Sequence, residues 1–199
     1  MKKSYIILVI LALGAAAGFV FFQPSLQKEE PAGRAAAQDY KNATYIIEER
    51  PIALANGISE LEATPGSNAK IITRYFGNEV RHDLDDDGRE DVVFLLTQET
   101  GGSGTFFYAV AALNTPAGYV GSQAFFLGDR IAPQTTNIDE SLTSRGTNRQ
   151  NVIVVNYAVR LPGEPFTARP SMGKSTWIKL DPATMQFGEV APDFEGESR

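Results

Sequence analysis

Short apolar segments separated by turn residues run through most of the chain after residue 42. The segments are rich in β-branched and aromatic residues, and Gly, Pro or Asn lies between many of them, which is typical of β-strands. Outside the N-terminal run, no segment repeats apolar residues at the helical spacing of 3.6. We expect strands at residues 43–48, 52–54, 58–61, 69–76, 91–99, 105–114, 118–127, 151–160 and 173–180.

Two of these strands are apolar on both faces. They are residues 91–99 and 105–114, joined by a glycine-rich segment, 100–104. Because a strand buried on both faces lies inside a sheet, they should form the central hairpin. Asn56-Gly57 predicts another hairpin, between residues 52–54 and 58–61. Strands with turns about every eight to twelve residues predict an all-β fold, either an antiparallel β-sandwich or an open barrel.

The N-terminus carries a long apolar run. Lys2 and Lys3 precede an uncharged stretch from Tyr5 to Phe22, which as a helix would span about 27 Å, near the thickness of a bilayer core. This length favours an uncleaved transmembrane signal anchor at residues 1–22. A cleaved signal peptide, ending at the small residues 15–17, is the alternative. With the lysines on the cytoplasmic side, the rest of the chain would lie outside the cytoplasm, on a single-pass protein of the cytoplasmic membrane or, after cleavage, secreted.

The composition of the remaining chain divides it into three parts. Residues 23–38 are rich in Pro, Ala and charge and predict a flexible tether. Residues 39–190 are long enough for one extracytoplasmic β-domain, and the polar residues 191–199 predict a loose tail.

Charge and cysteine content exclude several classes of protein. The net charge is −6 and no basic cluster alternates with aromatic residues, which argues against nucleic-acid binding. The chain has no cysteine, so no disulfide or thiolate metal site supports the fold. The core must hold the domain together, with a bound ion as a possible addition.

The acidic stretch 83–91 is the strongest chemical signal in the chain. It reads Asp-Leu-Asp-Asp-Asp-Gly-Arg-Glu-Asp, with carboxylates at loop positions 1, 3, 5 and 9 and glycine at position 6. Ca²⁺ takes six to eight oxygen ligands, and such a loop supplies them from alternate positions around a turn at the glycine. We predict a structural Ca²⁺ site formed by the side chains of Asp83, Asp85, Asp87 and Asp91 and the backbone carbonyl of Arg89.

The loop differs from a helical calcium hand and has a metal-free alternative. Position 12 is Phe94 where a hand has a bidentate Glu, so the loop leads into a strand. Without a cation the four carboxylates would repel one another. The alternative is an acidic surface turn in which Arg81 and Arg89 offset that repulsion.

Several segments together carry a family resemblance. The Asp-rich loop is similar to calcium loops of integrin-type repeats and of dockerin-like segments, although a single loop does not make a propeller. A wider pattern runs through residues 74–78, 83–88, 94–98, 100–106, 126–131 and 154–157. It resembles an uncharacterised β-rich domain of bacterial envelope and secreted proteins, and this resemblance implies the compartment and the calcium loop but no activity.

Two polar loops offer an enzymatic alternative. Asp129 and Arg130 lie in segment 128–136, and Glu164 lies in segment 161–167. They could converge on a hydrolase site, or equally form a structural ion pair. His82 is the only histidine, and the sequence contains no recognisable nucleophile elbow that would supply its partner. No catalytic residue is therefore assigned. The sequence favours a membrane-tethered binding or envelope module whose partner is an unknown envelope protein or small ligand.

Overall fold

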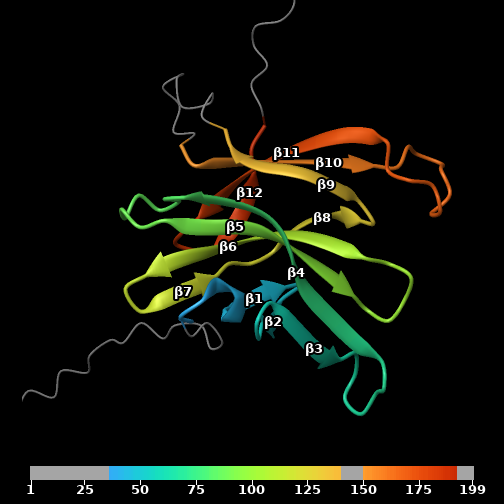
Figure 1. Cartoon of the computed structure of the whole chain (residues 1–199), viewed down its shortest axis with the longest axis horizontal. Helices are drawn as coiled ribbons and strands as arrows, with labels where there is room; N and C mark the ends of the chain where they lie inside the picture. Colours follow the sequence, from blue (N-terminus) through green and yellow to red (C-terminus); the bar gives the residue numbers. More distant parts are fainter. Residues whose placement is uncertain (1–35, 140–149, 192–199) are drawn as a thin grey trace, which may run out of the picture. The chain divides into compact units, whose positions relative to one another are not determined.

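The computed structural model describes residues 36–139 and 150–191, which form antiparallel β-sheets (Figure 1). The predicted anchor and most of the predicted tether and tail lie outside these residues. A single 3₁₀ turn, η1 (Tyr40–Asn42), precedes the strands. The strands are β1 (Thr44–Ile47), β2 (Arg50–Ala53), β3 (Ile58–Glu62), β4 (Lys70–His82), β5 (Asp91–Glu99), β6 (Phe106–Thr115), β7 (Gly118–Gly121), β8 (Phe125–Asp129), β9 (Ala132–Ile138), β10 (Val152–Val159), β11 (Met172–Asp181) and β12 (Gln186–Glu189).

The strands form three sheets. The largest has the order β3-β4-β5-β6-β7. Strand β8 also pairs with β6, along a different part of that strand from β7. A four-stranded sheet has the order β12-β11-β10-β9, and β1 pairs with β2 in a two-stranded sheet. No barrel closes in the described part of the chain, and the predicted antiparallel, sandwich-like all-β fold is confirmed.

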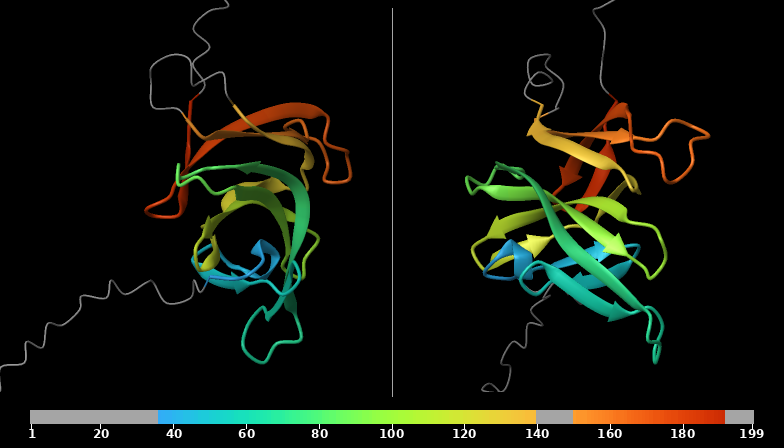
Figure 2. Two further views of the ribbon diagram at one scale, coloured as in Figure 1. Left: turned by 60° about the vertical axis from the view of Figure 1, so that its left-hand side comes forward. Right: turned by 45° about the vertical axis from the view of Figure 1, so that its right-hand side comes forward.

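The central sheet is covered on both faces (Figure 2). On one face, odd-numbered residues such as Val93, Leu95 and Ala109 pack with β10 and β11 side chains, and we call this cluster the sandwich core. On the other face, even-numbered residues such as Phe94 and Val110 pack under the β1–β2 hairpin, in a cluster we call the hairpin core. Because successive side chains of a strand point to opposite faces, this explains why β5 and β6 are apolar at nearly every position.

The Asn56-Gly57 turn forms, but the hairpin predicted around it does not. Both residues have positive φ, 51° and 82°, as a tight turn requires. The turn closes a single bridge between Ala55 and Ile58. Beyond it, β2 pairs with β1 and β3 pairs with β4, and the pairing of β2 with β1 leaves Ile52 buried in the hairpin core.

One close backbone contact holds the β1–β2 hairpin against β7. Gly121 lies on β7, and a Cβ there would come within 2.3 Å of the carbonyl oxygen of Thr44. Glycine therefore permits the approach of β1 to β7. Ala37 also pairs with Tyr119 of β7 in an antiparallel bridge, so the chain is fixed to the sheet before β1 begins.

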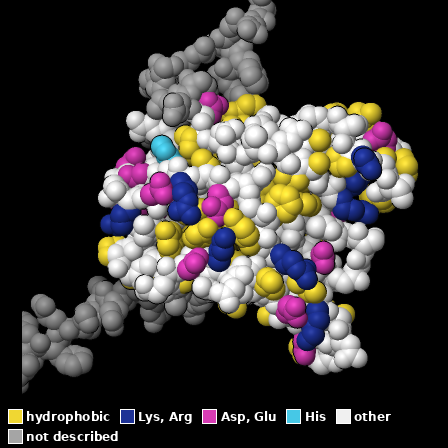
Figure 3. Space-filling view, viewed as in Figure 1, with side chains coloured by type: hydrophobic (Ala, Val, Ile, Leu, Met, Phe, Trp, Pro, Cys, Tyr) yellow, Lys and Arg dark blue, Asp and Glu magenta, His cyan; other side chains and the backbone are white. Residues whose placement is uncertain are grey.

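Exposed ion pairs flank β4 on both of its faces. Figure 3 shows basic and acidic side chains close to one another on the side of the molecule that it draws. Lys70 pairs with Glu62, Arg74 with Glu99, and Arg81 with Glu90, at 3.9, 3.4 and 3.4 Å. Exposed pairs of this kind contribute little to stability. Within the described ranges, no helix has the length and apolar character needed to cross a membrane.

Candidate metal centre

The acidic loop connects β4 to β5 at one end of the central sheet. His82 and Asp91 face each other in the β4–β5 register, so the loop is closed at its base by the sheet. Asp86 and Gly88 have φ of 60° and 84°, and these two left-handed residues turn the chain back on itself. The Gly88 turn expected from the sequence is therefore present.

Three of the predicted ligands converge. One carboxylate oxygen each from Asp83, Asp85 and Asp91 lies within 4.8 Å of the other two. Oxygens bound to one Ca²⁺ at 2.3–2.6 Å lie at most about 5 Å apart. The three side chains can therefore reach one ion as they stand.

Asp91 is the most buried carboxylate of the group. Its side chain is fully buried, and its two oxygens accept hydrogen bonds from the backbone N–H groups of Leu84 (2.8 Å) and Asn114 (2.7 Å). Burial raises the pKa of Asp91 to about 6, although these two bonds oppose the rise. The residue thus ties the loop to β6 and holds a carboxylate where water cannot solvate it.

Asp85 has an oxygen with no protein partner. Its Oδ1 atom is buried and accepts no hydrogen bond from any described residue. Burial raises the pKa of Asp85, and the neighbouring charge of Asp87 adds to the rise. Buried polar atoms nearly always have a partner, so this oxygen lacks something that the described side chains do not supply.

Asp83 organises the loop backbone. Its two oxygens accept the N–H groups of Asp87 (3.0 Å) and Gly88 (2.8 Å). Each carboxylate oxygen has a second lone pair, so these bonds leave Asp83 able to bind a cation. They also hold the turn in the shape that brings Asp83 near Asp85.

Asp87 pairs with the Arg89 side chain. The guanidinium of Arg89 forms an ion pair with the Asp87 carboxylate and also donates to the backbone oxygen of Asn114. The Asp87 carboxylate is not among the three that converge. For Asp87 to bind the ion, its carboxylate would have to release the Arg89 guanidinium.

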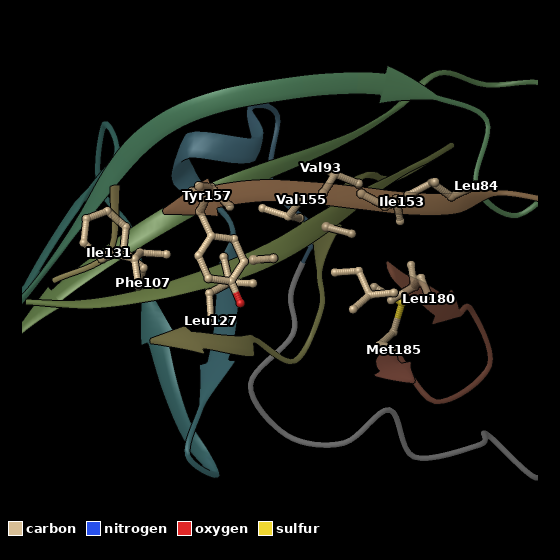
Figure 4. Packing of buried hydrophobic residues seen from close by; sticks show 14 of the residues in the cluster. Leu84, Val93, Phe107, Leu127, Ile131, Ile153, Val155, Tyr157, Leu180 and Met185 are labelled. Atoms are coloured by element: carbon tan, nitrogen blue, oxygen red, sulfur yellow. The ribbon is translucent and has the colours of Figure 1, made fainter. Parts of the chain in front are cut away.

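The loop is anchored to the sandwich core and to the second sheet. Leu84 is buried and belongs to the sandwich core (Figure 4). Asn151, just before β10, donates to the carbonyl of Leu84 (3.1 Å) and to Asp86 (3.3 Å), and its amide oxygen contacts His82 Nε2 at 3.0 Å. His82 therefore has a structural partner at the rim of the loop.

The loops proposed for a hydrolase site meet through an arginine–aromatic contact. The ring of Phe166 lies 4.3 Å from the Arg130 guanidinium and 5.6 Å from that of Arg160. Arg130 pairs with Asp129 at 2.6 Å, and Glu164 accepts the backbone N–H of Leu161 at 2.8 Å. Burial opposes a lowered pKa at Asp129, but the bonds from Arg130 and Thr105 lower it overall. A general acid would need the opposite shift.

A cavity of about 300 Å³ lies at the other end of β5. Its lining residues are Glu48, Gln98, Thr100, Phe106, Tyr108 and Phe126. It could not be predicted from the sequence, because the residues come from four separate segments that only the sheet pairing brings together. The one local signal is Glu48-Glu49 between two strands, a turn without glycine or asparagine.

Comparisons of the chain with family models, with curated proteins and with solved structures find no match.

Proposed function

We propose that this chain is a membrane-tethered extracytoplasmic β-domain that binds a structural Ca²⁺ in the 83–91 loop and acts as a binding or envelope module. The convergence of Asp83, Asp85 and Asp91 carries the metal part of the proposal. The apolar run from Tyr5 to Phe22, preceded by two lysines, supports the membrane part.

The donor set suits a hard cation. The converging donors are carboxylate oxygens only, and the described residues include no cysteine. Hard oxygen donors select Ca²⁺, Mg²⁺ or Mn²⁺ over the softer transition metals. Three carboxylates, completed by the Arg89 carbonyl and water, would suit the six to eight ligands of Ca²⁺ better than the rigid octahedron of Mg²⁺.

The ion would relieve two costs in the loop. It would provide a partner for Asp85 Oδ1, which is buried without one. It would also neutralise the buried charge of Asp91, whose pKa is raised to about 6 by burial. Asp85 follows Leu84 and Asp91 accepts the Leu84 N–H, so a bound ion would fix the entry to β5 and the adjoining edge of the sandwich core.

Calorimetric titration of the intact chain in a neutral detergent tests the metal site. We expect one Ca²⁺ per chain, binding with a Kd on the order of 10⁻⁴–10⁻³ M as in extracellular modules, and weaker binding of Mg²⁺. Asp85→Asn should abolish the binding heat. Asp86→Asn is the matched control, because Asp86 is an exposed neighbour in the same loop outside the converging group. Equal binding by the two variants would refute the assignment.

Cell fractionation tests the compartment. The chain should sediment with membranes, and its β-domain should be digested by protease added outside the cytoplasmic membrane. The intact mass of the membrane-bound protein separates an uncleaved anchor from a cleaved signal peptide. A chain recovered in the soluble cytoplasmic fraction would contradict the proposal.

The hydrolase alternative gains no support from the loops that suggested it. Among the described residues, the Asp129 carboxylate is held by Arg130 and Thr105, and the Glu164 carboxylate by Leu161. Asp129 ties the end of β8 to the start of β6, and Glu164 fixes its own loop.

A further inference from the structure

The cavity at the far end of β5 combines aromatic rings with a carboxylate. Phe106 and Tyr108 lie two residues apart on one face of β6. Phe126 of β8 pairs with Tyr108, and Gln98 of β5 pairs with Phe106, so all four side chains emerge on the same face of the sheet. This is the face that the β1–β2 hairpin covers, and the turn of that hairpin contributes Glu48.

The three rings form an open aromatic wall. The Tyr108 and Phe126 ring centroids lie 5.4 Å apart and those of Phe106 and Phe126 lie 6.4 Å apart, with both pairs tilted. Phe126 is 53% exposed although it is a large apolar residue. Exposed aromatic rings next to a hollow are typical of a binding surface rather than of a core.

The polar lining of the cavity includes acceptor oxygens and a negatively charged carboxylate. Among the described residues that line the cavity, Glu48 is the one charged side chain. Tyr108 donates its hydroxyl to Glu48 at 3.2 Å, which fixes the carboxylate beside the rings. Gln98 donates its amide to Thr73 at 3.1 Å, so its carbonyl oxygen is left as an acceptor. Thr100 adds a hydroxyl at the rim.

The turn that presents Glu48 has a strained backbone. Glu48 and Glu49 have φ of 48° and 65°, values that a two-residue hairpin turn normally assigns to Asn and Gly. Residues held in this region without being Gly or Asn often serve a ligand site. Here the strain places an acidic side chain at the mouth of the aromatic wall.

We propose that this cavity binds the ammonium group of an alkylamine, either a lysine side chain or a free polyamine. The aromatic faces attract a cation, Glu48 neutralises it, and the Gln98 and Thr100 oxygens accept its N–H groups, of which a primary ammonium has three. The inference deepens the binding role proposed above and names its ligand class, but it does not depend on calcium. Asp91 and Gln98 lie at opposite ends of β5, about 23 Å apart at the usual rise per residue.

Ligand titration of the intact chain, followed by NMR of labelled Phe and Tyr rings, tests the site. The probes are Nα-acetyl-lysine methylamide, cadaverine, the neutral Nα-acetyl-norleucine methylamide, and tetramethylammonium. An exposed site of this kind should bind the two amines with a Kd on the order of 1 mM. Tighter binding of the lysine compound would identify the natural ligand as a lysine side chain, and tighter binding of cadaverine would identify it as a free amine. The norleucine compound should not bind measurably.

Substitutions distinguish the contribution of the Glu48 charge to amine binding from that of the aromatic rings. Glu48→Gln should weaken amine binding by about tenfold or more, because it removes the charge and keeps the shape. Glu49→Gln is the control in the same strained turn, outside the cavity lining, and should change binding less than about twofold. Phe126→Leu should weaken binding severalfold while keeping the site apolar. Circular dichroism confirms that each variant is folded.

Three results would overturn the proposal. The first is no ring shift with either amine up to about 50 mM, far above the Kd of ~1 mM expected for such a site. The second is equal binding of the norleucine compound, or tighter binding of tetramethylammonium, since neither uses the oxygen acceptors. The third is an equal effect of Glu48→Gln and Glu49→Gln. Asp85→Asn, which tests the metal site, should leave amine binding unchanged, so either proposal can fail alone.

Discussion

Asp91→Asn separates the metal role of the loop from its structural role. Asp91 is fully buried and accepts two backbone hydrogen bonds. Asparagine has nearly the same shape but carries no charge and offers only one oxygen. One backbone N–H, of Leu84 or Asn114, would therefore face an amide NH₂ and lose its acceptor.

In the absence of calcium, two effects of this substitution oppose each other. Losing one buried acceptor costs about 1–3 kcal/mol. The pKa of Asp91 in the folded chain is raised to about 6, compared with about 3.9 when unfolded, so its charge at pH 7 costs about 3 kcal/mol of stability. Asparagine removes that cost. We expect the substitution to change the free energy of unfolding by less than about 2 kcal/mol in chelator at pH 7.

With calcium bound, the expectation changes. An ion present at 100 times its Kd stabilises the wild-type chain by about 2.7 kcal/mol, which raises the melting temperature of a domain of this size by roughly 5–11 °C. Asp91→Asn should lose this increment, because a ligand of the ion is gone. Asp86→Asn should keep it.

Thermal unfolding followed by circular dichroism measures all four states, with excess Ca²⁺ and with chelator, for wild type and variant. In chelator the wild-type stability should also fall as the pH rises from about 4 to about 6, since a raised pKa makes the folded chain favour the protonated carboxyl. A variant that is destabilised equally in calcium and in chelator would refute the metal role of Asp91. So would a wild-type melting temperature that calcium leaves unchanged.

Three further predictions concern the fold. Leu95→Ala, at a fully buried position of the sandwich core, should lower the free energy of unfolding in urea by about 2–5 kcal/mol. Gly121→Ala should lower the melting temperature because its methyl group would meet the Thr44 carbonyl at 2.3 Å, whereas Gly173→Ala, with open space around the new methyl group, should not. Asp129 has a lowered pKa, so it stabilises the fold above about pH 4 and this contribution is lost as the pH falls through its folded pKa; Asp129→Asn should therefore reduce the loss of stability in acid.

Each of these predictions has a contradicting result. Equal urea midpoints for Leu95→Ala and wild type would mean that this position is not packed as described. Equal melting temperatures for the two glycine variants would mean that β1 does not approach β7 this closely. An unchanged acid unfolding curve for Asp129→Asn would mean that the Arg130 and Thr105 contacts do not form.

The sequence predicted the parts of the fold that local pattern determines. Residues 91–99 and 105–114 are apolar at almost every position, and only a sheet covered on both faces can bury all of them, as β5 and β6 do. Strand β9 was missed, because Pro133 and the polar residues 134–137 resemble a loop and only pairing with β10 makes them a strand. The Asn56-Gly57 turn was found, but its strands pair elsewhere, since turn chemistry does not decide partners.

The same limit applies to the candidate sites. Asp83, Asp85 and Asp91 lie within one short loop, so their spacing alone brought them together. The sequence does not predict the ion pair between Arg89 and Asp87, because the position of the Arg89 side chain depends on its contact with the backbone oxygen of Asn114 on β6. The amine cavity could not be predicted from the sequence, because its lining depends on β-sheet register across segments up to 78 residues apart, from Glu48 to Phe126.

Diffraction from crystals of this chain grown in millimolar Ca²⁺ tests the central claim most directly, because the ion can be located by its anomalous scattering. The account predicts a peak at 2.3–2.6 Å from oxygens of Asp83, Asp85 and Asp91. Carboxylates of these three residues turned apart, with the Arg89 guanidinium between them and no anomalous peak, would contradict it.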